Sequence, residues 1–139
     1  MKKLLFLFCL LSWSVLHAQK TINRPPFIAK ATETIEIAAI HLSDTATVVD
    51  VDAKFIPKNW IRIAPATCLV ADNGERYQVR QGVGIELGQE FWMPESGEAT
   101  FSLIFPPLPA SVKSFDFVEG EGERDFNLFG CLLYTSPSP

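Results

Sequence analysis

The sequence predicts an all-β protein, an antiparallel, immunoglobulin-like β-sandwich of about seven or eight short strands. Three observations predict this class. Apolar and polar residues alternate over several short segments, and turn-forming residues separate these segments at intervals of roughly 8–12 residues. After residue 18, no window of about 11 residues or more has the apolar spacing of a helix. The composition, with 47% hydrophobic and 20% charged residues, is that of a folded domain and excludes a disordered chain.

Residues 1–18 have the features of a secretory signal peptide. Lys2 and Lys3 precede an apolar run over 4–11, and Ala18 supplies a small residue at the expected cut. A transmembrane helix needs roughly 20 apolar residues, so the run is too short to span a bilayer, and a retained membrane anchor is the alternative. We expect a chain exported to the periplasm or cell envelope, with no stable membrane insertion once the signal is removed.

Length and charge limit the classes of function. A chain of 139 residues leaves room for one domain, expected over residues 19–130, and excludes a second enzyme-sized lobe. The net charge is −4, with 16 acidic and 12 basic residues, and loss of the two signal lysines makes the chain more acidic. Nucleic-acid binding would require clustered Lys and Arg, so a nucleic-acid partner is not expected.

The first half of the domain has four segments with strand patterns. Residues 34–42 alternate and then shift phase, which predicts a strand with a bulge. Residues 48–55 predict a half-buried strand, and 60–63 and 68–71 predict two shorter ones. The sequence Asp72-Asn73-Gly74-Glu75 predicts a type I′ hairpin turn, because Asn-Gly tolerates positive φ at both central positions.

The second half continues the pattern. A strand is expected over 76–80, a flexible break over 81–84 and a short strand over 85–87. Further strands are expected over 100–105, 114–119 and 126–129, with turns at 94–97 and 120–123 and a proline-rich stop at 106–109. Six large aromatic side chains are predicted to fill the core: Phe55, Trp60, Phe101, Phe105, Phe115 and Phe117.

Few residues in the chain suggest chemistry. Cys68 and Cys131 follow the signal segment and could form one disulfide in an oxidising compartment, but no C-x-x-C motif provides a dithiol redox centre. Cys68 alone is either a reactive thiol or, more commonly, a small core residue. His41 is the only histidine after the signal, so any catalytic triad would need it, and the alternative is a surface residue on a strand.

Two further clusters are candidate binding sites. Asp44, Asp50 and Asp52 could ligate calcium with an acidic residue from 119–125, but their spacing does not match the twelve-residue calcium loop, and a solvated strand face is the better interpretation. No metal and no cofactor is therefore expected. Aromatic residues could instead form a stacking surface for a sugar or a peptide. The candidate surface-binding residues are Trp60, Phe91 and Trp92.

Several strings of residues resemble one known type of module. They are NRPPF at 23–27, AKFIPKNWIRI at 53–63, FWMPESGEA at 91–99, FPPLP at 105–109 and FDFVEGE at 115–121. Together they resemble the N-terminal β-sandwich region of exported thioredoxin-like (TlpA-type) disulfide reductases of Bacteroides-like bacteria. The resemblance covers roughly residues 23–130.

The resemblance implies a non-catalytic accessory module at the front of a thiol–disulfide oxidoreductase. In that family the redox pair lies in a later thioredoxin domain, so no catalytic residue is carried over and the fragment itself is not expected to be an enzyme. The implied partner is the downstream thioredoxin-like domain or a client protein. A stand-alone ligand-binding or adhesion domain at the cell surface is the alternative function.

The C-terminal segment 131–139 departs from the family pattern. Its sequence, CLLYTSPSP, resembles translated adapter sequence, and an ordinary Ser/Pro tail is the alternative. We expect a disordered or non-native tail after Gly130, and a parent protein longer than this fragment.

Overall fold

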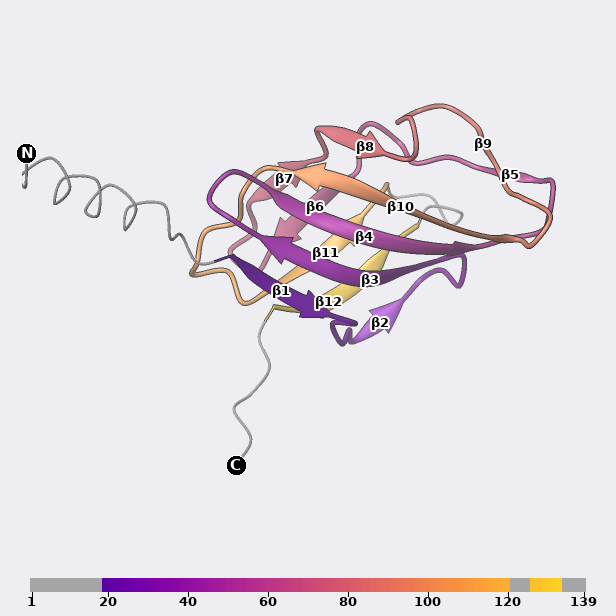
Figure 1. Cartoon of the computed structure of the whole chain (residues 1–139). Coiled ribbons are helices and arrows are strands. Elements are labelled where there is room, and N and C mark those ends of the chain that lie inside the picture. Colours follow the sequence, from indigo (N-terminus) through magenta and orange to yellow (C-terminus); the bar gives the residue numbers. More distant parts are fainter. Residues whose placement is uncertain (1–18, 121–125, 134–139) are drawn as a thin grey trace, which may run out of the picture.

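The computed structural model describes residues 19–120 and 126–133. They form two five-stranded antiparallel β-sheets packed face to face, which confirms the predicted all-β class (Figure 1). The first sheet has the order β1 (Lys20–Asn23), β3 (Ile35–Leu42), β4 (Thr47–Lys54), β10 (Glu98–Phe105) and β8 (Gln81–Val83). The second has the order β2 (Ala29–Lys30), β12 (Leu128–Leu132), β11 (Ser114–Val118), β6 (Cys68–Ala71) and β7 (Arg76–Gln78). The expected signal peptide, most of the acidic turn and residues 134–139 lie outside the described residues.

The long strands of the first sheet follow their sequence patterns. Along β4, every second side chain from Thr47 to Ala53 is buried, and β10 pairs with β4 in unbroken register from Glu98↔Lys54 to Phe105↔Thr47. The bulge predicted in β3 is confirmed, because the register with β4 shifts between Ile37 and Ala39. This extra residue lets the apolar positions on both sides of the bulge face the core.

The hairpin between β6 and β7 forms where it was predicted, but the type I′ turn is wrong. Gly74 has a φ of +88°, whereas Asn73 is not among the described residues with positive φ. The Gly74 N–H donates to the carbonyl of Ala71 at 2.9 Å, and the Ala71 N–H donates to Glu75 at 2.9 Å. This pattern is a type I turn followed by a glycine bulge, and it needs positive φ only at the glycine.

The segment after β7 differs from the prediction in two places. The expected flexible break at 81–84 contains β8, which pairs with β10 through Ser102↔Val83 and Ile104↔Gln81. The expected strand at 85–87 does not form. The chain turns back after β8 because the Ile85 carbonyl occupies the space that a Cβ on Gly82 would need. The glycine thus allows this close backbone approach.

The second sheet extends past the boundary expected after Gly130. β12 continues to Leu132, Cys131 lies opposite Phe115 of β11, and the side chains of Cys131 and Leu133 are buried. Gly130 does not end the strand. Its φ is +67°, and the side chain of Ile28 lies where a Cβ would stand, 2.7 Å from the nearest carbon. The folded part therefore reaches Leu133, which corrects the expected start of the tail at 131.

The core lies between the two sheets. Phe105 of β10 and Phe117 of β11 meet edge to face across it, with ring centroids 6.2 Å apart, and both are fully buried. Phe101 and Phe115 are also buried as predicted, but Phe55 and Trp60 are not. In the described part of the chain, no helix has the length and apolar character needed to cross a bilayer.

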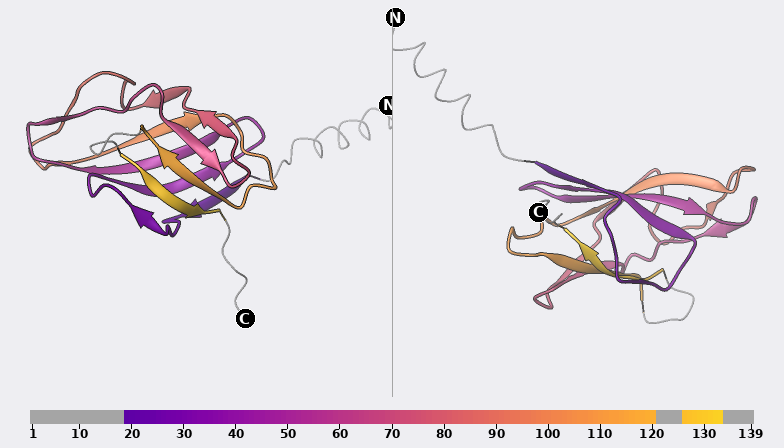
Figure 2. Two further views of the ribbon diagram at one scale, coloured as in Figure 1. Left: turned by 180° about the vertical axis from the view of Figure 1, so that it is seen from behind. Right: turned by 90° about the horizontal axis from the view of Figure 1, so that it is seen from below.

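The two ends of the sandwich differ. A third, two-stranded sheet of β5 (Trp60–Ile61) and β9 (Phe91–Trp92) extends from one end of the molecule. Figures 1 and 2 show that β1 begins and β12 ends toward the opposite end. The aromatic extension thus lies at one end of the sandwich, and the start of β1 and the end of β12 lie at the other.

Candidate functional site

The extension carries the residues that the sequence singled out for binding. Beyond the last β4–β10 pair, the Phe55 N–H donates to the Gly97 carbonyl at 2.9 Å, and the two chains then diverge. They pair again where the Met93 N–H donates to the Asn59 carbonyl at 2.7 Å. The antiparallel register of β5 and β9 places Trp60 directly opposite Trp92. Residues opposite one another in a sheet point to the same face, so the two indoles are cross-strand neighbours.

Both tryptophans are exposed. Trp60 is 43% and Trp92 is 59% accessible, and Phe55 and Ile56 in the preceding loop are exposed as well. These four side chains, Phe55, Ile56, Trp60 and Trp92, are called the aromatic tip below. Four of the seven large apolar side chains that are exposed on the described surface belong to it. Such a concentration is typical of an interaction surface.

Phe91, the third predicted binding residue, has a different position. It pairs with Ile61, which is buried, and its ring lies 6.1 Å from the ring of Phe101 in the core. Alternation along β9 therefore directs Phe91 inward and Trp92 outward. The structure brings Trp60 and Trp92 together as a surface and uses Phe91 to fix their strand to the sandwich.

The placement of Phe55 and Trp60 corrects the prediction that both belong to the core. The alternating pattern of β4 continues through Phe55 in sequence, but the strand ends at Lys54. Ile56 was not predicted as a surface residue. The signal for it was present, because the Ile-Pro pair follows the last alternating position and disfavours a continued ladder.

A cleft of about 740 Å³ adjoins the tip. Phe55, Trp60, Ile61 and Phe126 supply its apolar lining, and Glu33 and Arg62 are among its polar residues. This volume and this mixture of a few polar groups with aromatic side chains are those of a binding cleft.

Two ion pairs lie near the tip. Lys54 pairs with Glu98 at 3.4 Å, and Lys58 pairs with Glu95 at 3.8 Å, with all four side chains largely exposed. Exposed ion pairs contribute little to stability, but each of these four charges has a partner of the opposite sign. The exposed indole and aliphatic side chains of the tip favour partners with exposed apolar or aromatic groups.

Cys68 and Cys131 do not form a disulfide with each other. Both are free thiols, and they lie on the two strands that flank β11, Cys68 opposite Val118 and Cys131 opposite Phe115. Strand spacing and rise separate them by roughly 10 Å across the sheet and roughly 10 Å along it, beyond disulfide reach. Cys131 belongs to the core, whereas Cys68 accepts a contact from the Arg76 guanidinium at 3.6 Å and is 6% exposed.

Burial raises the pKa of the Cys131 thiol from 9.0 to about 12. Because the folded protein holds this proton more tightly than the unfolded chain does, the unfolded chain releases it first as the pH rises above 9. We therefore expect the free energy of unfolding to fall between pH 9 and pH 12, and to fall less steeply in a Cys131→Ala variant. Denaturant titrations at several pH values measure the two slopes. Parallel slopes would contradict the assignment of this proton to Cys131.

His41 lies in a hydrogen-bonded chain on the outer face of the first sheet. Its Nδ1 is 3.1 Å from Thr21 Oγ1 and its Nε2 is 2.7 Å from Asp50 Oδ2, while the Ser102 hydroxyl donates to Asp50 Oδ1 at 2.7 Å. These residues come from β1, β3, β4 and β10, which are neighbours in that order. The chain thus ties four adjacent strands together, in agreement with the interpretation of His41 as a surface strand residue.

Among the candidate calcium ligands that the structure describes, Asp50 and Asp52 have protein partners, and residues 121–125 lie outside the described part of the chain. Asp52 accepts a hydrogen bond from Arg24 at 2.8 Å, next to a second pair between Lys30 and Glu36 at 3.0 Å. The hydrogen bond from Lys30, reinforced by its positive charge, lowers the pKa of Glu36. Across residues 19–120 and 126–133, no group of three or more His, Cys, Asp or Glu side chains is arranged to hold a metal ion.

Comparison of the chain with protein-family models, with curated proteins and with solved structures gives no match.

Proposed function

We propose that this domain is a non-catalytic accessory module of an exported thiol–disulfide oxidoreductase of the thioredoxin-like family. Its role is to bind client proteins through the aromatic tip and so hold them near the redox domain. The observation that carries the proposal is the pairing of Trp60 with Trp92 on an exposed extension of an otherwise closed sandwich.

Two of the strings that resemble the family meet at this tip. The string at 53–63 contains β5 and the string at 91–99 contains β9, and these two strands pair only with each other. Segments about 30 residues apart in the sequence thus build one surface. This supports the interpretation that these strings encode a binding surface as well as a fold.

The chemistry of the tip suits a client that needs disulfide reduction. Misfolded or partly unfolded proteins expose apolar and aromatic side chains, which pack against exposed tryptophans. The neighbouring Lys54 and Lys58 are each paired with a glutamate, so apolar contact rather than these two charges would hold the client. A module with these properties would accept clients of varied sequence.

The positions of the thiols support a non-catalytic role. A reactive cysteine needs an accessible thiolate, but burial holds the Cys131 pKa near 12, and Cys68 is buried beneath Arg76. We expect the purified chain to accelerate insulin reduction by dithiothreitol no more than a blank without protein. Turnover that disappears in a Cys68→Ala variant would contradict the proposal.

The cleft beside Trp60 favours the alternative function, a stand-alone ligand-binding or adhesion domain. The gene that encodes this chain distinguishes the two. The accessory role predicts a reading frame that continues into a thioredoxin-like domain with a C-x-x-C motif. A natural stop codon soon after the sandwich would favour the stand-alone domain.

A further inference from the structure

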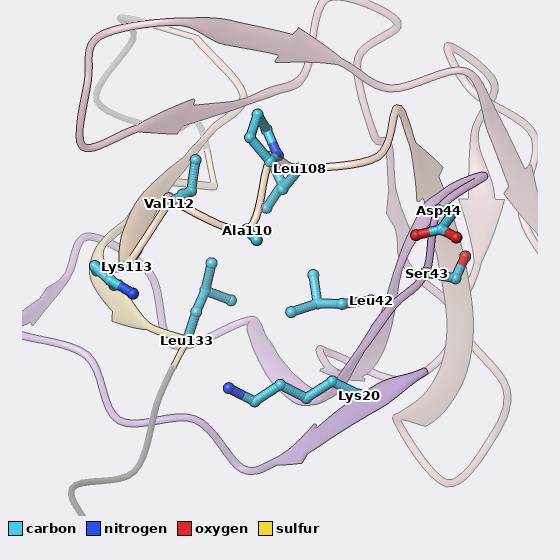
Figure 3. A pocket seen from close by; sticks show the side chains of 10 residues that line it. Lys20, Leu42, Ser43, Asp44, Leu108, Ala110, Val112, Lys113 and Leu133 are labelled. Carbon is cyan, nitrogen blue, oxygen red and sulfur yellow. The ribbon is translucent and has the colours of Figure 1, made fainter. Parts of the chain in front are cut away.

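A second cavity lies at the end of the sandwich opposite the aromatic tip. Its volume is about 300 Å³, and it opens between the start of β1, the turn after β3, the loop between β10 and β11, and the end of β12 (Figure 3). Both sheets contribute to its walls. Neither the resemblance nor the proposed function makes use of it.

The inner part of this cavity is apolar. Leu42 comes from the first sheet, Leu108 and Val112 come from the connecting loop, and Leu133 follows the last strand of the second sheet. Figure 3 shows the side chains of Leu42 and Leu133 pointing into the same space. Val112 and Leu133 are themselves almost fully buried, so this wall is part of the packed core and is preformed.

The mouth of the cavity carries two lysines. Lys20 and Lys113 line it from opposite chain segments (Figure 3), and neither side chain forms an ion pair with any residue that the structure describes. Every other described lysine is engaged with a glutamate: Lys30, Lys54 and Lys58. Two ammonium groups above an apolar wall are complementary to a molecule with an anionic head and an apolar tail.

The size of the cavity restricts the ligand. Ser43 and Asp44 line part of it, and the two lysines supply the positive charge that attracts an anionic head group. A cavity of about 300 Å³ is at the small end of the range for ligand sites, which suits a short alkyl chain.

We propose that this cavity binds aliphatic monocarboxylates of short to medium chain length, with the carboxylate between Lys20 and Lys113 and the alkyl chain against Leu42, Leu108 and Leu133. The binding involves no covalent step. It is independent of the aromatic tip, so it can be tested whether or not the domain serves an oxidoreductase.

Titration calorimetry of the full chain with butanoate, hexanoate and octanoate tests the apolar part of the proposal. We expect affinity to rise with chain length until the cavity is filled, by up to about fourfold for each methylene group that is buried. Octanol, which has a similar alkyl chain and no charge, is expected to bind at least fivefold more weakly than octanoate. Equal affinities for octanol and octanoate would overturn the role of the lysines, and absence of octanoate binding would overturn the site itself.

Substitution tests the charged part. A Lys20→Met/Lys113→Met double variant keeps the apolar stems and is expected to lose at least fivefold in octanoate affinity. The matched control is Lys54→Met/Lys58→Met, which removes two lysines near the other end of the molecule and is expected to bind octanoate as the unmodified chain does. Thermal melting of both variants checks that they remain folded. An equal loss in the two variants would mean that octanoate senses only overall charge, and the proposal would be wrong.

Discussion

Phe117→Ala is expected to lower the free energy of unfolding by about 3–5 kcal/mol, one of the two largest effects expected from a single substitution in this chain. Phe117 is fully buried on β11 and meets Phe105 of β10 edge to face. The pair joins the two sheets. Removal of one ring therefore leaves a cavity between them, and the other ring loses its aromatic partner. Denaturant unfolding followed by circular dichroism measures the loss.

Two control variants keep this prediction testable even if Phe117→Ala does not fold. Phe117→Leu retains most of the apolar volume and is expected to cost roughly 1–2 kcal/mol. Phe129→Ala removes a ring that is 38% exposed on the second sheet and is expected to cost less than about 1 kcal/mol. A larger loss for Phe129→Ala than for Phe117→Leu would contradict the placement of the core between these sheets.

Gly97→Ala is expected to destabilise the protein by about 2–3 kcal/mol and to change the fluorescence of the aromatic tip. Gly97 has a φ of +71°, and a Cβ there would lie 2.7 Å from the carbonyl oxygen of Phe55. A left-handed conformation costs a non-glycine residue roughly 1–2 kcal/mol, and relief of the clash would weaken the hydrogen bond from Phe55 to Gly97, worth about 1 kcal/mol. Chemical denaturation and tryptophan emission report the two effects.

Gly74→Ala, in the hairpin between β6 and β7, is the matched control for Gly97→Ala. Gly74 has a φ of +88°, but nothing lies within 4 Å of the position that a Cβ would take. An alanine at position 74 would therefore suffer only the strain of the left-handed conformation. We expect the free energy of unfolding to fall by about 1–2 kcal/mol, with unchanged tip fluorescence. The difference between the two variants isolates the clash with Phe55. If the two substitutions were equally costly, the close contact that holds the tip would be disproved.

The sequence predicted the long strands well because each is stabilised by a pattern that it carries itself. In β4 and β10 a strict alternation places Val49, Val51, Phe101 and Leu103 on the buried face, and this alternation is visible without any partner. The bulge in β3 was visible for the same reason, as a change of phase. The position of each long strand, and which of its side chains are buried, could thus be predicted from the local sequence pattern.

The parts that were missed depend on distant segments. Phe55 was assigned to the core because the period of β4 reaches it, yet it stands 37% exposed where β4 has already ended. Gly82 was predicted to lie in a flexible break and Gly130 at the end of the domain, but each lies within a strand and gives room to a neighbour, Ile85 in one case and Ile28 in the other. A pattern of residue types along the chain does not show such close contacts between segments.

The candidate site was only partly predictable. The outward direction of one ring in Phe91-Trp92 follows from alternation, but the pairing of Trp92 with Trp60 depends on a register between segments about 30 residues apart. The cavity beneath Lys20 and Lys113 carries no local signal, because its walls come from four separate parts of the chain. Convergence of this kind appears only with the tertiary fold.

Client binding by the aromatic tip is the most direct test of the proposed function. We suggest fluorescence anisotropy of a labelled polypeptide that has been reduced, alkylated and thereby kept unfolded, titrated with the full chain. The proposal predicts that the unfolded polypeptide binds and its folded form does not, that Trp60→Ala/Trp92→Ala weakens binding roughly tenfold or more, and that Phe129→Ala leaves it unchanged. Equal binding by the double tryptophan variant and the unmodified chain, or no binding at all, would contradict the assignment.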